Sequence, residues 1–377
     1  MLPNNVITPG SAEELAAVLR ESASLGRTIA LFGQATKNRM GGPITPADVT
    51  VSTCRMTRVL QYEPRDLTIS VEAGMLFRDL SLLLARNRQM IPLDPPFSET
   101  ATIGGVLATN SSGPRRRLYG TGRDLLIGMK YATVEGKIIQ SGGMVVKNVA
   151  GLDMGKLFVG SFGTLGAMAV VNFKLQPMPQ HERHFVLSYD SLEEACKARD
   201  RILASVLQPQ SLDLLNPEAA RELGLDGFVL SLETGGNPAV IERYQAELAP
   251  MGTLGIAAPD LAGRLREFTP AFLTSHPSGV VVRASCRLSQ ISEVAAAPVP
   301  VVARAGSGVA YLHYAVPAAS KEALGRWKAI IEFSPESRPS DLELWPSPGS
   351  DLEIMKRVKL MLDPHQLLNR GRLFGRI

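Results

Sequence analysis

The chain has 377 residues, of which 45% are hydrophobic and 20% are charged, and its formal net charge is +4. This length predicts two domains or three lobes with full cores, and the weak, mixed charge excludes the clustered basic face of a nucleic-acid-binding protein. The one tight basic run, Arg115-Arg116-Arg117, is interpreted as a solvated loop or as a contact to an anionic ligand or partner.

Three cysteines, Cys54, Cys196 and Cys286, lie far apart and include no Cys-x-x-Cys pair. They indicate neither a zinc site nor an iron–sulfur cluster, and they fit a reducing cytoplasm. The N-terminus shows no signal-peptide pattern, and no stretch approaches the roughly 20 apolar residues that span a membrane. We expect a cytoplasmic protein that does not insert into a membrane and that associates with one only through partners.

The first part of the chain predicts an α+β domain over residues 1–177. A helix is expected over 12–25, because Ser11 and Glu14 form a capping box and Gly26 follows its last turn. Strands are predicted over 28–32, 49–53, 66–73, 129–134, 138–141 and 167–175, with a second helix over 77–87. The segment Pro177-Met178-Pro179 is interpreted as a linker.

Residues 178–340 show strand–helix–strand units that predict a ferredoxin-like antiparallel sheet with helices on one face. Strands are expected over 184–189, 211–215, 227–232, 280–286 and 309–315, and helices over 191–204, 238–249, 291–297 and 320–333. No internal repeat stands out. A tail over 341–377, with a helix over 354–362 and coil at 367–372, is expected to return to the first domain.

Residues 101–166 are dense in glycine, which indicates positive φ angles or a backbone that closely approaches a ligand. The standard nucleotide motifs fail here. Gly120-x-Gly122-x-x-Leu125 lacks the third glycine of a dinucleotide-binding fingerprint, and neither Gly136-Lys137 nor Gly155-Lys156 is followed by the Ser or Thr of a P-loop. A Gly-x-Ser-x-Gly hydrolase elbow is absent, and His181-x-x-His184 has no carboxylate to complete a metal site, so no metal is expected.

A second glycine-containing loop, residues 33–42, follows a predicted strand and contains Thr36, Lys37 and Asn38. Consecutive N–H groups with a hydroxyl and an ammonium form an anion nest suited to a pyrophosphate. A plain surface loop is the alternative interpretation of this segment taken alone.

Several ordered blocks resemble the FAD-contacting segments of vanillyl-alcohol oxidase/p-cresol methylhydroxylase (PCMH) type flavoproteins. These blocks are Asp94-Pro95-Pro96, the run from Ala101 to Asn110, Tyr119-Gly120 with Arg123-Asp124, and Gly160-Ser161-x-Gly163-Thr164-Leu165-Gly166. Lys147-Asn148-Val149-Ala150-Gly151-x-Asp153 and the tail from Leu368 to Arg372 are most similar to the FAD-binding (E-type) subunit of bacterial glycolate oxidase.

The resemblance implies an FAD-binding PCMH-type domain of two α+β subdomains, with FAD between them, and a C-terminal ferredoxin-like lobe. It implies that Gly33, Gln34, Ala35, Thr36, Lys37 and Asn38 hold the pyrophosphate, and that Pro95, Thr102, Ile103, Gly104, Gly105, Thr109, Ser111, Gly113, Gly120 and Asp124 form a wall along the cofactor. Val145, Val146, Gly163, Thr164 and Gly166 would lie near its adenine and ribityl end, and Asn369 and Arg372 would reach the flavin ring or an anionic substrate.

Two departures from the family pattern refine this expectation. Many relatives carry an acidic residue where this chain has Phe162. Relatives with covalent FAD carry a histidine anchor, whereas this loop has Thr36-Lys37-Asn38, so we expect noncovalent, dissociable FAD.

The resemblance further implies an oxidoreductase acting on a CH–OH donor, with glycolate or another 2-hydroxy acid as substrate. This subunit would work with a flavoprotein subunit and pass electrons to an iron–sulfur partner. Two alternatives are a non-catalytic FAD-holding relay or assembly subunit, and a stand-alone FAD-linked oxidase of another hydroxylated substrate.

The chemistry needs a cation for the carboxylate and a base for the hydroxyl. Arg116, Lys147 and Arg372 are candidate cations. The available histidines outside the linker are His276, His313 and His365, and His313, in an alternating strand, is interpreted as a buried structural histidine, so no catalytic base is assigned.

Overall fold

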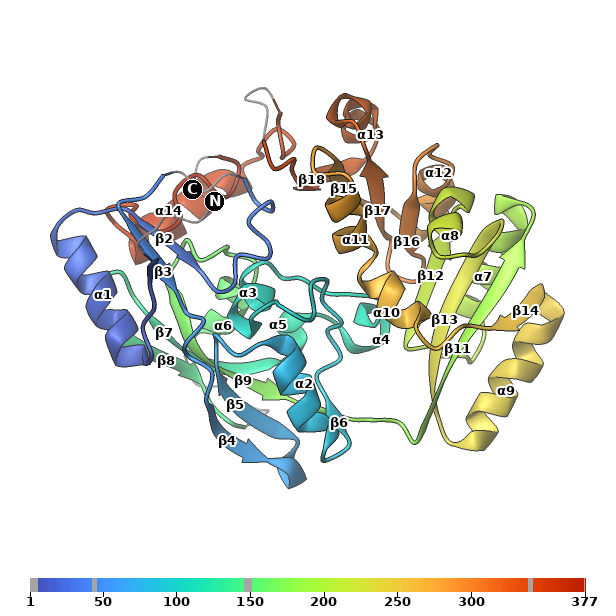
Figure 1. Ribbon diagram of the computed structural model, residues 1–377, viewed down its shortest axis with the longest axis horizontal. Helices are drawn as coiled ribbons and strands as arrows, with labels where there is room; N and C mark the ends of the chain where they lie inside the picture. The colour runs from blue at the N-terminus through green and yellow to red at the C-terminus, as the bar shows by residue number, and fades with distance from the viewer. Residues whose placement is uncertain (1–5, 43–45, 146–150, 338–341, 376) are drawn as a thin grey trace. The chain divides into compact units, whose positions relative to one another are not determined.

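The computed structural model describes residues 6–42, 46–145, 151–337, 342–375 and 377 (Figure 1). The chain divides into two compact units. Unit 1 comprises residues 1–112, 121–178 and 347–377, and unit 2 comprises residues 113–120 and 179–346. Unit 1 is therefore assembled from three separate stretches of sequence.

The N-terminal subdomain of unit 1 is a three-stranded parallel sheet in the order β1-β3-β2, made of β1 (Val6–Ile7), β3 (Val49–Ser52) and β2 (Ile29–Phe32). Helix α1 (Ala12–Ser24) begins at Ser11, whose hydroxyl accepts a hydrogen bond from the N–H of Glu14 at 3.1 Å. The Glu14 carboxylate accepts from the N–H of Gly10 at 2.7 Å, one residue before the position that a capping box uses.

The second subdomain is a five-stranded antiparallel sheet in the order β4-β5-β9-β7-β8. Its strands are β4 (Val59–Glu63), β5 (Thr68–Glu72), β9 (Ala167–Lys174), β7 (Leu126–Ala132) and β8 (Ile138–Gly142). Its core also takes side chains from helices α2 (Phe77–Ala85), α3 (Ile103–Ala108) and α6 (Met154–Phe158), and a small ribbon pairs β6 (Gln89–Met90) with β10 (Gln176–Pro177). These are the two expected α+β subdomains.

The C-terminal tail joins both subdomains of unit 1. Helix α14 (Asp351–Leu362) packs Val358 and Leu362 against the core of the five-stranded sheet. Beyond it, Leu368 bridges to Ile29 of β2 in parallel register, and Leu367 and Leu368 enter the core beneath the parallel sheet. The tail is therefore part of the first unit's structure.

A buried ion pair anchors this tail. The Lys359 ammonium donates to the Asp363 carboxylate at 2.6 Å and to the backbone oxygens of Thr164 and Leu368 at 2.7 and 2.9 Å. Asp363, fully buried, accepts in turn from the N–H groups of Leu367 and Leu368 at 3.0 and 2.8 Å. The pair thus connects the end of α14, the turn that follows it and the segment around Thr164.

Unit 2 contains one eight-stranded antiparallel sheet in the order β14-β11-β13-β12-β16-β17-β15-β18. Its first half is β11 (His181–Tyr189), α7 (Leu192–Ala204), β12 (Ser211–Leu215), α8 (Pro217–Glu222), β13 (Phe228–Gly236), α9 (Pro238–Leu248) and β14 (Thr253–Ile256). Its second half is β15 (Val280–Ser285), α12 (Ile291–Ala295), β16 (Val301–Arg304), β17 (Val309–Tyr314), α13 (Lys321–Arg326) and β18 (Lys328–Phe333). The second half has the ferredoxin-like βαββαβ order, and the first half has the same order with α8 inserted between β12 and β13. The halves join where Leu214 and Leu215 pair with Ala303 and Val302.

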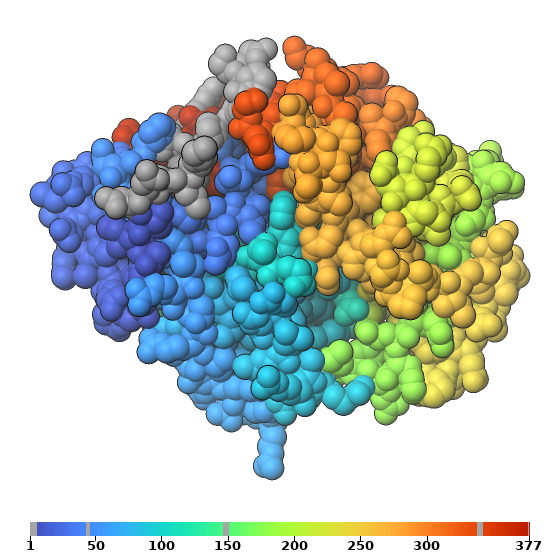
Figure 2. Space-filling view, in the orientation of Figure 1, coloured from blue at the N-terminus to red at the C-terminus, as the bar shows by residue number. Residues whose placement is uncertain are grey.

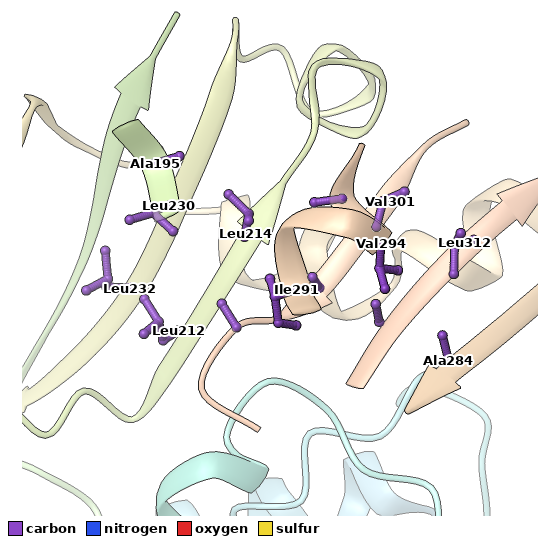
Figure 3. Packing of buried hydrophobic residues seen from close by; sticks show 14 of the residues in the cluster. Ala195, Leu212, Leu214, Leu230, Leu232, Ala284, Ile291, Val294, Val301 and Leu312 are labelled. Atoms are coloured by element: carbon purple, nitrogen blue, oxygen red, sulfur yellow. The ribbon is translucent and has the colours of Figure 1, made fainter. Parts of the chain in front are cut away.

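The main core of unit 2 lies between one face of this sheet and helices α7, α9, α12 and α13. Figure 3 shows Ala195 of α7 and Ile291 and Val294 of α12 in this core with residues of the strands. Leu212, Leu214, Leu230 and Leu232 point to this side because side chains alternate between faces along a strand. Helix α9 buries Ile241, Tyr244 and Leu248, while its other residues form the yellow surface in Figure 2. A smaller cluster with α8, α10 (Leu261–Arg266) and α11 (Phe268–Ser275) covers part of the opposite face.

The structure corrects several expectations about elements. The helix predicted over 320–333 is wrong in its second half, because α13 ends at Arg326 and, after Trp327, residues 328–333 form β18, with Ala329, Ile331 and Phe333 buried in strand alternation. The sequence showed no repeat, yet unit 2 is built from two equivalent halves. Strands β4, β14 and β16 and helices α3, α8, α10 and α11 were also missed.

The buried pair gives a stability prediction. Lys359→Met should lower the free energy of unfolding of unit 1 by about 3–5 kcal/mol, because it leaves the Asp363 carboxylate buried without its cation. Lys356→Met, which removes the exposed i,i+3 pair to Glu353 on the same helix, should change it by under about 0.5 kcal/mol. Urea unfolding measures both, and equal shifts would contradict the assigned role of the pair.

Candidate cofactor site

A pocket opens in unit 1 at the end of β2. It contains about 730 Å³ of space outside the protein atoms, including its opening to solvent. Its lining comes from the loop after β2, from α3, from the 162–168 segment and from the tail: Leu31, Phe32, Gly33, Gln34, Ala35, Thr36, Lys37, Asn38, Thr53, Thr102, Gly104, Gly105, Ala108, Thr109, Phe162, Gly163, Gly166, Met168 and Arg372. The two glycine-rich segments recognised in the sequence therefore face the same space.

The loop after β2 presents backbone N–H groups to this pocket. Within the described residues, the N–H groups of Gln34, Ala35 and Thr36 donate no hydrogen bond to the protein. Ala35 adopts a left-handed conformation with φ of 53°, and the Asn38 N–H then closes a turn onto the Ala35 oxygen at 3.1 Å. Such a turn, with unpaired N–H groups and alternating handedness, is the geometry of an anion nest.

Close packing explains the glycine at the start of this loop. A Cβ atom at Gly33 would overlap the side chain of Thr102. Thr102 is buried and caps α3, accepting a hydrogen bond from the N–H of Gly105 at 3.2 Å. Gly33 therefore lets the loop and α3 meet at the pocket wall.

The Thr102–Thr109 block is a short helix rather than an open loop. Ile103, Val106 and Leu107 point into the core of the five-stranded sheet. A Cβ at Gly104 would lie 3.0 Å from the backbone oxygen of Ala73, whereas one at Gly105 would approach only the Thr102 hydroxyl, at 3.1 Å. Gly104 thus serves packing of the helix, and Gly105 leaves room at the pocket.

Two cations line the pocket, and none of its described lining residues is a carboxylate. Lys37 is only 5% exposed, with its ammonium 5.6 Å from the centre of the Phe97 ring. Arg372 is 7% exposed, and burial lowers its pKa to about 10. A buried site with positive charge and unpaired N–H groups suits a pyrophosphate, so these residues fit the anionic part of FAD.

The 160–166 block forms the wall beside Arg372. Phe162 has φ of 55°, and the centre of its ring lies 5.7 Å from the guanidinium carbon of Arg372. The Phe162 oxygen accepts from the Asn369 amide at 2.7 Å, and a Cβ at Gly163 would lie 2.7 Å from that amide. The tail and the block are therefore fitted to each other.

The structure brings thirteen of the sequence-predicted residues together in the pocket: Gly33, Gln34, Ala35, Thr36, Lys37, Asn38, Thr102, Gly104, Gly105, Thr109, Gly163, Gly166 and Arg372. Seven others are described in unit 1 outside its lining, including Asp124 and Asn369. Pro95, Ile103, Ser111 and Thr164 are buried, and Val145 is 61% exposed. Val146 and the candidate cation Lys147 fall outside the described residues.

The remaining predicted residues have structural partners. Both ends of the Asn369 amide bind backbone groups, including the N–H and the oxygen of Leu31 at 2.6 and 3.0 Å. Asp124 accepts from the N–H of Thr121 at 2.7 Å and caps helix α5 (Gly122–Leu125). Gly113, Gly120 and Arg116, from the segment that contains helix α4 (Arg116–Tyr119), belong to unit 2.

Six lining residues were not predicted from the sequence: Leu31, Phe32, Thr53, Ala108, Phe162 and Met168. Most are apolar and carry no motif of their own. Ala108 could have been found from Gly104 and Gly105, because residues three and four apart share a helix face once the block is read as a helix. Phe162 was noted only as a departure from the family pattern.

The histidines do not gather at this site. The His313 ring is 1% exposed in unit 2, with its nitrogens 2.9 Å from the Thr269 hydroxyl and 3.1 Å from the Pro300 oxygen, and burial lowers its pKa to about 4. Its predicted structural role is confirmed. His184 contacts the Ser231 hydroxyl at 2.6 Å, and its pKa is also lowered to about 4, chiefly by burial. Among the residues that the structure describes, no cluster of His, Cys, Asp or Glu could hold a metal ion.

Family comparisons agree with this geometry. Residues 3–142 match the FAD binding domain family, and residues 348–373 match the C-terminal domain of FAD linked oxidases. The first match covers the loop after β2 and α3, and the second covers the tail that contributes Arg372. The two matches thus meet at the pocket.

Relatives include the glycolate oxidase subunit GlcD of Bacillus subtilis, 28% identical over 79% of this chain and 65% of that protein. The glycolate oxidase subunit GlcE of Escherichia coli is 35% identical over 40% of this chain and 43% of its own length. A D-2-hydroxyglutarate dehydrogenase of Xanthomonas citri is 24% identical over 99% of this chain and 89% of its own. The chain thus spans less than two thirds of the two glycolate oxidase subunits.

Among solved structures, an alkyldihydroxyacetonephosphate synthase superposes with a TM-score of 0.74 at 16% identity, over 97% of this chain and 75% of that one. At this identity the likeness concerns the fold alone. It agrees with an FAD-binding PCMH-type domain followed by an α+β lobe.

The pocket wall gives a binding prediction. Gly105→Val should weaken FAD binding by at least about 100-fold, because its added methyl groups enter the pocket, while the protein stays folded. Gly263→Val, at a glycine of helix α10 in unit 2, is the matched control, because a Cβ placed there would have no neighbouring atom within 4 Å. It should leave FAD affinity unchanged. Flavin fluorescence titration of apoprotein measures both, and normal flavin content in Gly105→Val would refute this assignment of the wall.

The matched segments, the fold and the charge of the pocket lead to one assignment. The lining fits FAD, and the chain carries the FAD binding domain together with the tail of FAD linked oxidases. The chain thus carries an FAD binding domain and the C-terminal segment of FAD linked oxidases, and it is similar in sequence to glycolate oxidase subunits and D-lactate dehydrogenases.

Proposed function

We propose that this chain is a subunit of a 2-hydroxy acid oxidase or dehydrogenase that binds FAD noncovalently in the unit 1 pocket. The observation that carries the proposal is the pairing of two buried cations, Lys37 and Arg372, with unpaired N–H groups in a pocket whose described lining has no carboxylate. We assign the pyrophosphate to the loop of residues 33–38, and the face of the cofactor to Gly105, Thr109 and Gly163.

The substrate class rests on the relatives. GlcD and GlcE are named as glycolate oxidase subunits, and the relative that is matched over nearly its whole length is named for D-2-hydroxyglutarate. All three names refer to 2-hydroxy acids. Glycolate is the substrate we propose to test first, and D-lactate the second.

The proposal assigns onward electron transfer to an iron–sulfur partner chain. Cys54, Cys196 and Cys286 are the chain's three cysteines, fewer than a four-cysteine cluster requires, and all are free. GlcD and GlcE are both named as subunits, which supports an assembly of several chains, including a flavoprotein partner. In the described part of the chain, no helix has the length and apolar character to span a membrane.

The pocket binds and orients but offers no proton acceptor of its own. Its described lining includes no histidine, carboxylate, cysteine or tyrosine, and Lys37 and Arg372 are cations. FAD, when bound, supplies the acceptor for the hydride that leaves the hydroxyl-bearing carbon. This lining favours, as a second candidate function, an FAD-holding relay subunit beside a catalytic flavoprotein.

Anaerobic reduction tests the two functions. The full chain, reconstituted with FAD, is mixed with glycolate or D-lactate without oxygen, and the flavin absorption is followed. Bleaching by the chain alone supports catalysis by this subunit. A flavin that stays oxidised until a partner subunit is added supports the relay, and a chain that binds no FAD overturns both.

Acid precipitation tests the mode of attachment. Thr36-Lys37-Asn38 contains no histidine, cysteine or tyrosine to form a flavin bond, and none lines the described pocket. We expect all flavin in the supernatant after trichloroacetic acid treatment. Flavin fluorescence that remains with the protein pellet on a denaturing gel would contradict noncovalent binding.

A further inference from the structure

Arg372 holds an unusual position in the pocket wall. Its Nη1 atom donates to the backbone oxygens of Gly42 at 2.7 Å, Met40 at 2.8 Å and Asn38 at 3.3 Å. Its Nε atom is buried and has no hydrogen-bond partner among the described residues, none of whose carboxylates pairs with the guanidinium. The side chain thus clamps the loop after β2, and a residue that lines the pocket retains an unused N–H donor.

This arrangement leaves a buried positive charge without a negative one. Backbone oxygens carry only partial charges, and burial without a counterion disfavours the charged form, so the pKa of Arg372 falls to about 10. A buried arginine is normally paired. An anion in the pocket would complete the site and remove this cost.

Phe162 explains why the protein itself supplies no such anion. Its ring lies against Arg372, at 5.7 Å from the guanidinium carbon, and Phe162 is itself a lining residue of the pocket. A carboxylate at this position would lie within reach of the guanidinium and would neutralise it. The aromatic ring gives only a cation–π contact, which leaves the charge uncompensated.

We propose that Arg372 of the tail binds the pyrophosphate of FAD together with Lys37, and that Phe162 keeps its charge available for that anion. This inference rests on the proposed function, in which FAD occupies the pocket. The pyrophosphate carries two negative charges, which match the two cations of the lining. The residue is a binding and positioning group, because the same guanidinium orders the loop whose N–H groups face the pocket.

Ligands with and without a pyrophosphate should respond differently to loss of the Arg372 guanidinium. FAD and ADP carry the pyrophosphate, whereas riboflavin shares only the ring and side chain of the flavin. Arg372→Met should weaken FAD and ADP binding by about 10- to 150-fold, the range for lost hydrogen bonds to a charged group. Riboflavin affinity should stay within about twofold.

Phe162 provides a second variant that keeps the arginine clamp. Phe162→Glu should weaken FAD and ADP by at least about tenfold, because the new carboxylate pairs with Arg372 and repels the phosphates. Phe162→Leu, the matched control, preserves an apolar side chain and should bind FAD within about threefold of the parent. Both variants retain Arg372, whose three backbone contacts in the parent chain are to Asn38, Met40 and Gly42 and do not involve Phe162.

The experiment titrates the full-length apoprotein of each variant with FAD, ADP and riboflavin, using flavin fluorescence and calorimetry, with thermal unfolding as a check on folding. If Arg372→Met loses affinity for FAD and ADP but keeps its affinity for riboflavin, the proposal is supported. Unchanged FAD affinity in Arg372→Met, or unchanged affinity in Phe162→Glu, overturns it. Equal loss of all three ligands in a folded Arg372→Met assigns the residue to the loop alone and also overturns it. A parent chain that binds no FAD overturns the proposed function itself, a result separate from these.

Discussion

The buried Lys359–Asp363 pair is the interaction on which the cofactor pocket depends. It joins α14, the turn after it and the 160–166 block, because the ammonium and the carboxylate between them bind the backbone of Thr164, Leu367 and Leu368. From this fixed point the chain continues to Asn369 and Arg372, which bind β2 and the loop after it. Separating the two buried charges would leave each of them without a partner, at a high cost in free energy. The pair therefore fixes the path of the tail.

The glycine-rich segments have different physical reasons for their composition. Positions 33 and 104 require glycine because the Thr102 side chain and the Ala73 backbone lie against them, whereas a Cβ at Gly105 would approach only the Thr102 hydroxyl. The density of glycine in the sequence correctly indicated close approach. It did not distinguish approach by the protein's own chain from approach by a ligand, since both require a missing Cβ.

Sequence patterns predicted most elements, the two subdomains and the cofactor. They failed where a local signal was weak or ambiguous. The run from Ser320 to Phe333 continues a helix-forming composition into an edge strand, and only tertiary pairing with β15 decides its state. Arg372 was identified through a family motif, but its contacts with Asn38, Met40 and Gly42 join residues at opposite ends of the chain, which no local pattern can reveal. The doubled βαββαβ order of unit 2 was hidden because its halves share an arrangement of elements rather than a visible sequence motif.

The three-part composition of unit 1 has a consequence for biosynthesis. Translation proceeds from Gly33 through all of unit 2 before Arg372 is made, so the pocket lacks one of its cations until the tail has left the ribosome. Unit 2, whose residues precede the tail, is able to complete its sheet while unit 1 still waits for its last segment. The complete pocket therefore depends on a segment made long after the loop of residues 33–38, so its lining is assembled from parts that are synthesised at widely separated times.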